Sequence, residues 1–251
     1  MKDKNQIKTA MILAAGLGTR MKDLTLNVPK PLLPIRDTTI IELIIKKLVN
    51  SGFNKIIINL HYKSELIREH LEKQDDKSVK LIFSEEPDIL GTAGGIAKAK
   101  KYFNGQNILV MNSDIFSDIS LNNFSQHYKQ SQSIATMAVY PSDDNINYSL
   151  ITYDNDQMLT GFLKKGQAVA NGVNTGIFMG FQLLSEKSQN FLKPYYSSII
   201  EDLYLNALRN GYKISVYIHQ GIWYDLGTKQ NYKDFLESIE RNPGLLEEFY
   251  K

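Results

Sequence analysis

The sequence predicts an α/β fold: a Rossmann-like mixed sheet that is mainly parallel, helices on its faces and a small antiparallel lobe. Strand and helix signals alternate through the first 140 residues, which is the pattern of βαβ units in a parallel sheet. The later part contains a hairpin signal, with the turn "DNDQ" at 154–157 between two apolar runs. Of the 251 residues, 43% are hydrophobic, enough for one substantial core, so we expect a single domain over 1–251.

The elements of the first part follow one another along the chain. The apolar run over 10–15 predicts a buried strand. Thr39-Ile40-Ile41-Glu42 has the form of a capping box, so a helix begins there, and Gly52 ends it. Strands are then predicted over 55–60, 79–83 and 107–114, with helices over 64–73 and 92–103.

The second part is richer in strand signals. Apolar segments over 133–140 and 148–153 predict two strands, and the hairpin turn joins the latter to a third over 158–163. Further strands are predicted over 173–180 and 212–218, with an amphipathic helix over 197–210 between them. No internal repeat or linker interrupts the pattern.

The composition excludes several classes of function. The formal net charge is +2 with both signs interleaved, which argues against a nucleic-acid groove but permits small anionic ligands. There is no cysteine, so disulfides, zinc–thiolate sites and iron–sulfur clusters are excluded. The start "MKDKNQIKTA" is too polar for a signal peptide, and no apolar run is long enough to span a bilayer. We therefore expect a cytoplasmic protein that acts without a membrane; no oligomeric state follows from the sequence.

A glycine turn follows the first predicted strand, in "MILAAGLGTRMKDLTLNVPKPLLPI" (11–35). It is not a dinucleotide fingerprint, because Met21 stands where the third glycine would allow close helix–strand packing. It is not a Walker loop either, because Gly-Thr-Arg replaces Gly-Lys-Ser/Thr. Glycines still let a backbone approach phosphate and donate N–H groups to it.

Two cations follow this turn. Arg20 carries a planar guanidinium that suits phosphate oxygens. Lys30 stands between Pro29 and Pro31, which predicts an extended, stiff segment with a well-placed ammonium. Behind a glycine turn, the pair indicates a phosphate site.

These residues resemble the signature of the sugar-1-phosphate nucleotidyltransferases, L-A-A-G-x-G-T-R-M-x-P-L-T-x-x-x-P-K-P-L-x-P. In this chain Asp23 replaces the usual proline, which alters the loop but removes no phosphate ligand. The resemblance implies that Arg20 and Lys30 are catalytic. It also implies a nucleotide-binding set made of Leu13, Ala14, Ala15, Gly16, Gly18 and Thr19.

Further stretches resemble the same family in the same order. "EEPDILGTAGGI" (85–96) resembles the segment along the base and the sugar, implying nucleotide contacts from Glu85, Glu86, Gly91 and Gly94 and a sugar contact from Gly95. "LVMNSDIF" (109–116) and "IWYDLGTKQNY" (222–232) supply two acids, Asp114 and Asp225. The resemblance implies that these acids hold Mg²⁺, a hard cation that pairs with carboxylates and substrate phosphates.

The sugar side matches less closely. "VNTGIFMG" (173–180) resembles the N-x-G-I segment, so Asn174 and Gly176 are expected to face the sugar. Glu201 is a candidate for sugar hydroxyl contacts. "FLKKG" (162–166) retains Lys165 but lacks the glutamate and proline of the family's Glu-Lys-Pro segment, which bears on sugar recognition more than on catalysis.

The implied reaction joins a nucleoside triphosphate and a sugar 1-phosphate, and releases pyrophosphate. A carboxylate of Glu85 or Glu86 would suit the adjacent N–H donors of guanine, and the length resembles the short mannose- and heptose-1-phosphate guanylyltransferases. Short uridylyltransferases for amino sugars and cytidylyltransferases for phosphocholine are alternatives. A nucleotide-sugar-binding regulatory protein is an alternative of another class, although such a sensor need not retain both metal carboxylates.

Overall fold

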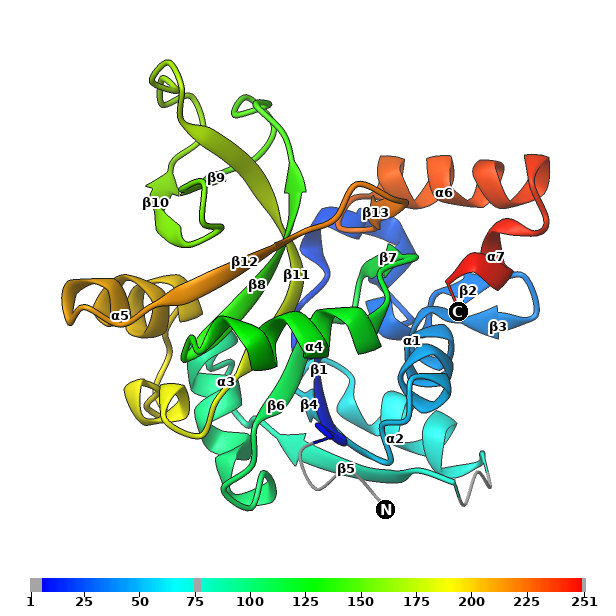
Figure 1. Cartoon of the computed structure of the whole chain (residues 1–251). Coiled ribbons are helices and arrows are strands. Elements are labelled where there is room, and N and C mark those ends of the chain that lie inside the picture. The colour runs from blue at the N-terminus through cyan, green and yellow to red at the C-terminus, as the bar shows by residue number, and fades with distance from the viewer. Residues whose placement is uncertain (1–5, 75–77, 250–251) are drawn as a thin grey trace.

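The computed structural model describes residues 6–74 and 78–249, and within them a nine-stranded mixed sheet forms the centre of the molecule (Figure 1). Residues 1–5, 75–77 and 250–251 are not described. They include the polar start of the sequence and a few positions of the single domain expected over 1–251. The parallel part has the order β6-β1-β4-β5. These strands are β1 (Thr9–Leu13), β4 (Lys55–Leu60), β5 (Lys80–Glu85) and β6 (Ile108–Asn112).

Both faces of this parallel part are apolar, as expected for a sheet covered by helices on each side. Along β1, Ala10 and Ile12 belong to one core cluster, and Met11 between them belongs to the other. Successive side chains of a strand point to opposite faces, so one short apolar run contributes to two cores.

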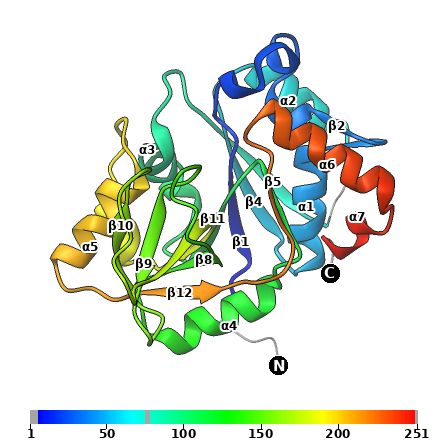
Figure 2. The same ribbon diagram turned by 90° about the horizontal axis from the view of Figure 1, so that it is seen from above.

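The helices lie in two layers, which Figure 2 shows from above. One core cluster contains apolar side chains of α1 (Ile40–Asn50), α2 (Ser64–Glu72) and α4 (Leu121–Ser131). The other contains those of α3 (Gly91–Ala99) and of the segment formed by η5 (Ile200–Leu205) and α5 (Asn206–Arg209). The predicted capping box of α1 is confirmed, since the Thr39 N–H donates to Glu42 Oε2 at 2.7 Å. The Rossmann-like expectation is thus confirmed.

The antiparallel part is organised by one long strand, β11 (Asn174–Leu184). It pairs antiparallel with β6, with β8 (Ala135–Pro141) and with β9 (Leu150–Tyr153). The predicted hairpin is confirmed, because β9 pairs antiparallel with β10 (Leu159–Leu163). The remaining strand, β12 (Ile214–Ile218), pairs parallel with β8. The hairpin and the first half of β11 form a lobe at one end of the sheet, at the upper left of Figure 1.

Several elements lie outside the sequence predictions. A small antiparallel pair joins β7 (Ile115–Ser117) to β13 (Trp223–Asp225), and another joins β2 (Pro34–Ile35) to β3 (Thr38–Thr39). The C-terminal helices are α6 (Lys229–Arg241) and α7 (Leu245–Glu248). α6 is strongly polar, and its only buried side chains are those of Tyr232, Phe235 and Ile239. The sequence analysis also does not predict α4, because this helix has few apolar residues.

The predicted helix over 197–210 differs in form. Residues 200–205 are wound as a π-helix, and the α-helix covers only Asn206–Arg209. In the described residues no helix has the length and apolar character needed to cross a membrane.

Candidate active site

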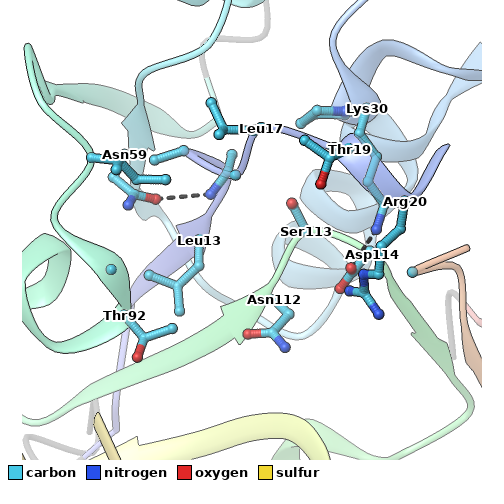
Figure 3. Close-up of a pocket in the computed structure, with 18 residues that line it drawn as sticks. Leu13, Leu17, Thr19, Arg20, Lys30, Asn59, Thr92, Asn112, Ser113 and Asp114 are labelled. Carbon is cyan, nitrogen blue, oxygen red and sulfur yellow. Dashed lines mark hydrogen bonds and ion pairs between the residues drawn. The ribbon is translucent and has the colours of Figure 1, made fainter. Parts of the chain in front are cut away.

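A pocket of about 400 Å³ lies at the carboxyl ends of β1 and β6, the edge where open α/β sheets bind ligands (Figure 3). Its walls come from segments far apart in the sequence: the loop after β1, the start of η2 (Lys30–Leu32), the ends of β4 and β6, the start of α3 and the turn after β13. The predicted site residues that line it are Leu13, Ala14, Ala15, Gly16, Gly18, Thr19, Arg20, Lys30, Gly91 and Asp114.

The glycine turn is shaped by Gly18, whose φ of 67° lies in the left-handed region that favours glycine. Its carbonyl accepts hydrogen bonds from the Met21 N–H at 2.9 Å and the Thr25 hydroxyl at 3.0 Å, which closes the turn into η1 (Thr19–Thr25). A Cβ atom at Gly16 would meet no atom within 4 Å, so this side of the loop faces open space in the pocket. Met21 is fully buried in the core and does not line the pocket.

Lys30 is buried and forms an ion pair with Asp114 on the side of the pocket where Arg20 lies (Figure 3). The prediction that Lys30 is extended is wrong: Pro29 is extended, and Lys30 is the first residue of the 3₁₀ turn η2. Proline is tolerated in the first turn of a helix because its missing N–H has no partner to lose there, so Pro31 permits the turn.

Asp114 and Asp225 lie on adjoining segments although 110 positions separate them in the sequence. β13 pairs with β7 so that Asp225 stands opposite Ile115, and the Leu226 N–H donates to the Asp114 carbonyl at 2.8 Å. Arg20 lies beside Asp225, since a Cβ atom on Gly227 would be 2.7 Å from Asp225 Oδ1 and 3.0 Å from Arg20 Nη2. Arg20, Lys30 and Asp114 therefore gather at one side of the pocket, and Asp225, which does not itself line the pocket, lies beside Arg20.

The electrostatics of this group follow from its geometry. Burial, and then the negative charge of Asp114, raise the pKa of the Asp225 carboxyl above its ordinary value. A hydrogen bond from the Gly227 N–H and the charges of Lys30 and Arg20 oppose that rise. A further cation bound between the two acids would relieve the repulsion between their carboxylates.

The donor set suits magnesium only together with a substrate. Among the described residues no cluster of three or more acids or histidines could hold a metal by itself. Mg²⁺ commonly uses one or two carboxylates and completes its shell with water and substrate phosphates. The carboxylates of Asp114 and Asp225, beside a glycine turn that can bind phosphate, fit that requirement.

Glu86 is a buried structural group, which differs from the expectation that it reads a base. Its carboxylate accepts from Asn59 Nδ2 at 2.6 Å and from the Leu90 N–H at 3.0 Å, while Asn59 Oδ1 accepts from the Ala14 N–H at 2.8 Å. This chain of hydrogen bonds ties the glycine loop to the segment before α3. Glu85 is not among the pocket-lining residues and pairs with Arg68.

The glycines of α3 serve packing more than ligand approach. Gly91 lines the pocket with a φ of 67°, and a Cβ atom there would lie 2.5 Å from the Ser197 carbonyl oxygen. A Cβ atom on Gly94 would collide with the Tyr195 carbonyl. One on Gly95 would lie 2.7 Å from Glu86 Oε1. Gly94 and Gly95 do not line the pocket, and the close packing around them explains why both positions are glycine.

The residues predicted for the sugar do not line this pocket. Lys165 is exposed in the turn after β10, and Glu201 is exposed on η5. Asn174 Nδ2 donates to Asn155 Oδ1 at 3.2 Å. Gly176 packs against β8, where a Cβ atom would meet Val139 and, at 2.7 Å, the Tyr140 carbonyl oxygen. Its role is therefore in the sheet.

The pocket also contains polar residues that the sequence analysis did not assign to it. Asn59 and Thr92 lie at the side opposite Arg20, and Asn112 and Ser113 lie between them (Figure 3). Asn59 and Asn112 could have been assigned to the pocket from the sequence, because both lie near the carboxyl ends of predicted parallel strands. Gly227 completes the wall beside Arg20.

Known proteins resemble this chain in sequence and fold. The family model described as nucleotidyl transferase matches residues 9–242. The mannose-1-phosphate guanylyltransferase catalytic subunit beta of Drosophila pseudoobscura pseudoobscura is 31% identical over 234 residues, 92% of this chain and 61% of that protein. The D-glycero-alpha-D-manno-heptose 1-phosphate guanylyltransferase of Campylobacter jejuni is 29% identical over 235 residues, 90% of this chain and 98% of that protein.

Solved structures give the same relationship. The crystal structure of HddC from Yersinia pseudotuberculosis complexed with GMP-PN has a TM-score of 0.77 and 25% identity, and the match covers 93% of this chain and 100% of that one. The chain spans 61% to 63% of the length of the mannose-1-phosphate guanylyltransferases of Drosophila and Xenopus that it matches.

Proposed function

Because the chain belongs to the nucleotidyl transferase family, we propose that it transfers a nucleotidyl group from a nucleoside triphosphate to a sugar 1-phosphate. The products are a nucleotide sugar and pyrophosphate. One observation carries the proposal: Arg20, Lys30, Asp114 and Asp225 meet beside a glycine loop at the edge of one pocket. A pocket for a neutral ligand would not need this charge.

The chemistry requires positioning more than activation. A phosphate oxygen of the sugar 1-phosphate forms a bond to the α-phosphorus. The bond from that phosphorus to the oxygen bridging it to the β-phosphorus breaks, and its electron pair leaves with pyrophosphate. The nucleophile is already an anion near neutral pH, so a base is not needed. Alignment and stabilisation of spreading negative charge therefore dominate.

The residues of this chain divide that work. Arg20 binds the β- and γ-phosphates and the developing pyrophosphate, and Lys30 binds phosphate nearer the reacting centre. Asp114 and Asp225 would hold Mg²⁺. When bound, the ion would neutralise phosphate charge and help to orient the triphosphate. The base would lie toward Asn59 and Thr92, away from the charged group.

GTP is the proposed donor, with mannose 1-phosphate or heptose 1-phosphate as acceptor. The proposal is supported by the relatives that are guanylyltransferases for mannose 1-phosphate and heptose 1-phosphate, and by the similarity to HddC, whose structure contains GMP-PN. Glu85 and Glu86 do not add support, since both carboxylates are paired within the protein. A uridylyltransferase for amino sugars and a cytidylyltransferase for phosphocholine are the alternatives.

A thermal-shift panel with GTP, UTP, CTP and dTTP, each with Mg²⁺, tests the donor, and we expect the largest rise in melting temperature with GTP. Pyrophosphate release is then measured for each nucleotide with mannose 1-phosphate, heptose 1-phosphate, an amino-sugar 1-phosphate and phosphocholine. Stabilisation by UTP alone would overturn the choice of GTP. Binding without pyrophosphate release from any pair would favour a regulatory nucleotide-sugar-binding protein.

A further inference from the structure

A second pocket, of about 480 Å³, adjoins the first at Arg20. It is lined by Arg20, Lys22, Thr228, Lys229, Gln230 and Lys233, and we name it the lysine pocket. Arg20 lines both pockets, and Thr228 directly follows Gly227 of the first. A group held by Arg20 in the first pocket therefore lies at the border of the second.

The lysine pocket is strongly cationic. Four of its six lining side chains are cations, and the acid Asp23 lies next to them. Asp23 pairs with Lys229, whose Nζ lies 2.6 Å and 2.7 Å from its two oxygens. Within residues 6–74 and 78–249, Lys22 and Lys233 are exposed and form no ion pair with an acid, although the charge of Lys233 helps to lower the pKa of Asp23. These two side chains can meet an anion without first breaking an ion pair, and Arg20 lies between them and Asp225.

The backbone beside this pocket is strained. Lys22 has φ 55° and ψ −123°, a backbone conformation that residues other than glycine rarely adopt. The kink lies between Arg20, which lines the first pocket, and Asp23, which reaches Lys229 at the start of α6. Asp23 stands where the family commonly has proline, so its pair with Lys229 links the phosphate loop to α6 through a feature of this chain.

We propose that the lysine pocket is a release site for inorganic pyrophosphate, which passes from Arg20 to Lys22 and Lys233 on its way to solvent. This inference rests on the proposed function, because pyrophosphate is its leaving group. Exposed lysines bind a polyanion weakly enough to release it, since water and salt screen their charges. The first turn of α6 adds N–H groups that also favour an anion.

Three variants test the site: Lys22→Gln, Lys233→Gln and the double variant, with Lys80→Gln as the control. Lys80 begins β5, at the edge of the parallel sheet opposite the pocket. We expect the inhibition constant of pyrophosphate, and its KM in the reverse reaction, to rise about 2- to 5-fold for each single variant. In the double variant these two pyrophosphate constants should rise about 4- to 25-fold, while KM for the nucleotide should change by less than about twofold.

Three outcomes would overturn the release site while leaving the reaction intact. One is unchanged pyrophosphate constants in the double variant. Another is an equal rise in KM for the nucleotide, which would make the lysines part of the triphosphate site. Inorganic phosphate is the comparison ligand: if the variants weaken its inhibition as much as that of pyrophosphate, the pocket is a general anion site and the proposal fails.

A binding measurement separates this inference from the proposed function. Calorimetric titration of the wild-type protein and the double variant with magnesium pyrophosphate requires no turnover. Weaker binding by the double variant, with melting temperature retained, supports the pocket even if no sugar phosphate is accepted. Equal binding by both proteins rejects the pocket even if the transfer reaction is confirmed.

Discussion

The phosphate side and the expected sugar side of this molecule are built in different ways. On the phosphate side, Arg20, Lys30, Asp114 and Asp225 come from four segments and meet at one place. On the sugar side, the predicted residues are spread over the helix α3, a turn, a strand and a π-helix, and none of them lines the pocket. Parallel strands bring their carboxyl ends to one edge of a sheet, whereas no such rule places the loops of the antiparallel lobe.

The largest expected effect separates the two sides directly. Asp114→Asn removes the partner of buried Lys30 and one of the two acids, so we expect turnover to fall by about 10²–10³-fold. The turnover of Arg20→Ala should fall by a similar factor, while that of Lys165→Ala should stay within about threefold of the wild-type value. Pyrophosphate release at saturating substrates measures all three. Near-wild-type turnover of either phosphate-side variant, with the fold intact, would remove that residue from the mechanism.

Two glycine variants sharpen the comparison, because one glycine borders flexible side chains and the other borders backbone. A Cβ atom on Gly227 would press on the ends of Arg20 and Asp225, which can move. Gly227→Ala should therefore fold normally but lose about 10²-fold in turnover, since catalysis depends on their placement. Gly176→Ala would press on the Tyr140 carbonyl and destabilise the protein by about 1–3 kcal/mol.

Melting temperature and turnover are measured together for this pair. For a chain of this size, 1 kcal/mol corresponds to about 2–4 °C. A large fall in the melting temperature of Gly227→Ala would show that its effect is on folding. Loss of turnover by stable Gly176→Ala would place that glycine in the site after all.

The neighbouring glutamates provide a matched pair with a smaller effect. In Glu86→Gln one oxygen becomes an amide donor, which leaves either Asn59 Nδ2 or the Leu90 N–H without an acceptor. An unpaired buried group costs about 1–3 kcal/mol. If about 1–2 kcal/mol of this cost falls on nucleotide binding through the displaced glycine loop, KM for the nucleotide rises about 5- to 30-fold while turnover is largely kept. Glu85→Gln, which loses only its half-exposed pair with Arg68, should stay within about twofold.

A KM change is the decisive measurement here, because a purely structural role for Glu86 would lower the melting temperature and leave KM unchanged. Equal KM values for the two glutamate variants would contradict the role of the Glu86–Asn59 hydrogen bonds in positioning the loop.

The sequence predicted the phosphate side better than the rest for physical reasons. The apolar runs of β1, β4 and β6 are short and bounded by polar residues, so the strands and the polar groups at their ends are readable. The approach of Asp225 to Asp114 was not readable from spacing, since it depends on pairing of β13 with β7. The burial of Glu86 was missed because "SEEP" resembles a solvated loop until Asn59 of another strand supplies its partner.

The smallest predicted effect concerns Asp225, where loss of the negative charge should raise the stability of the protein. The pKa of the Asp225 carboxyl is raised in the folded protein, mainly by burial and then by Asp114. The folded state therefore holds that proton more tightly than the unfolded chain, so the stabilising contribution exists at low pH and is lost as pH rises through the raised pKa. In the protein without substrate, ionisation of this carboxyl beside Asp114 therefore costs stability.

Asp225→Asn removes the charge but keeps an oxygen that can accept from the Gly227 N–H. Without nucleotide, we expect its melting temperature at pH 7 to exceed that of the wild type by a few degrees, about 2–4 °C for each 1 kcal/mol recovered. The difference should shrink as pH falls toward the ordinary carboxyl pKa of about 4. Adding the nucleotide with Mg²⁺ should stabilise the wild type more than the variant. A variant less stable than the wild type at pH 7 would show that Asp225 supports the fold, and that the two acids are not held together at the expense of stability.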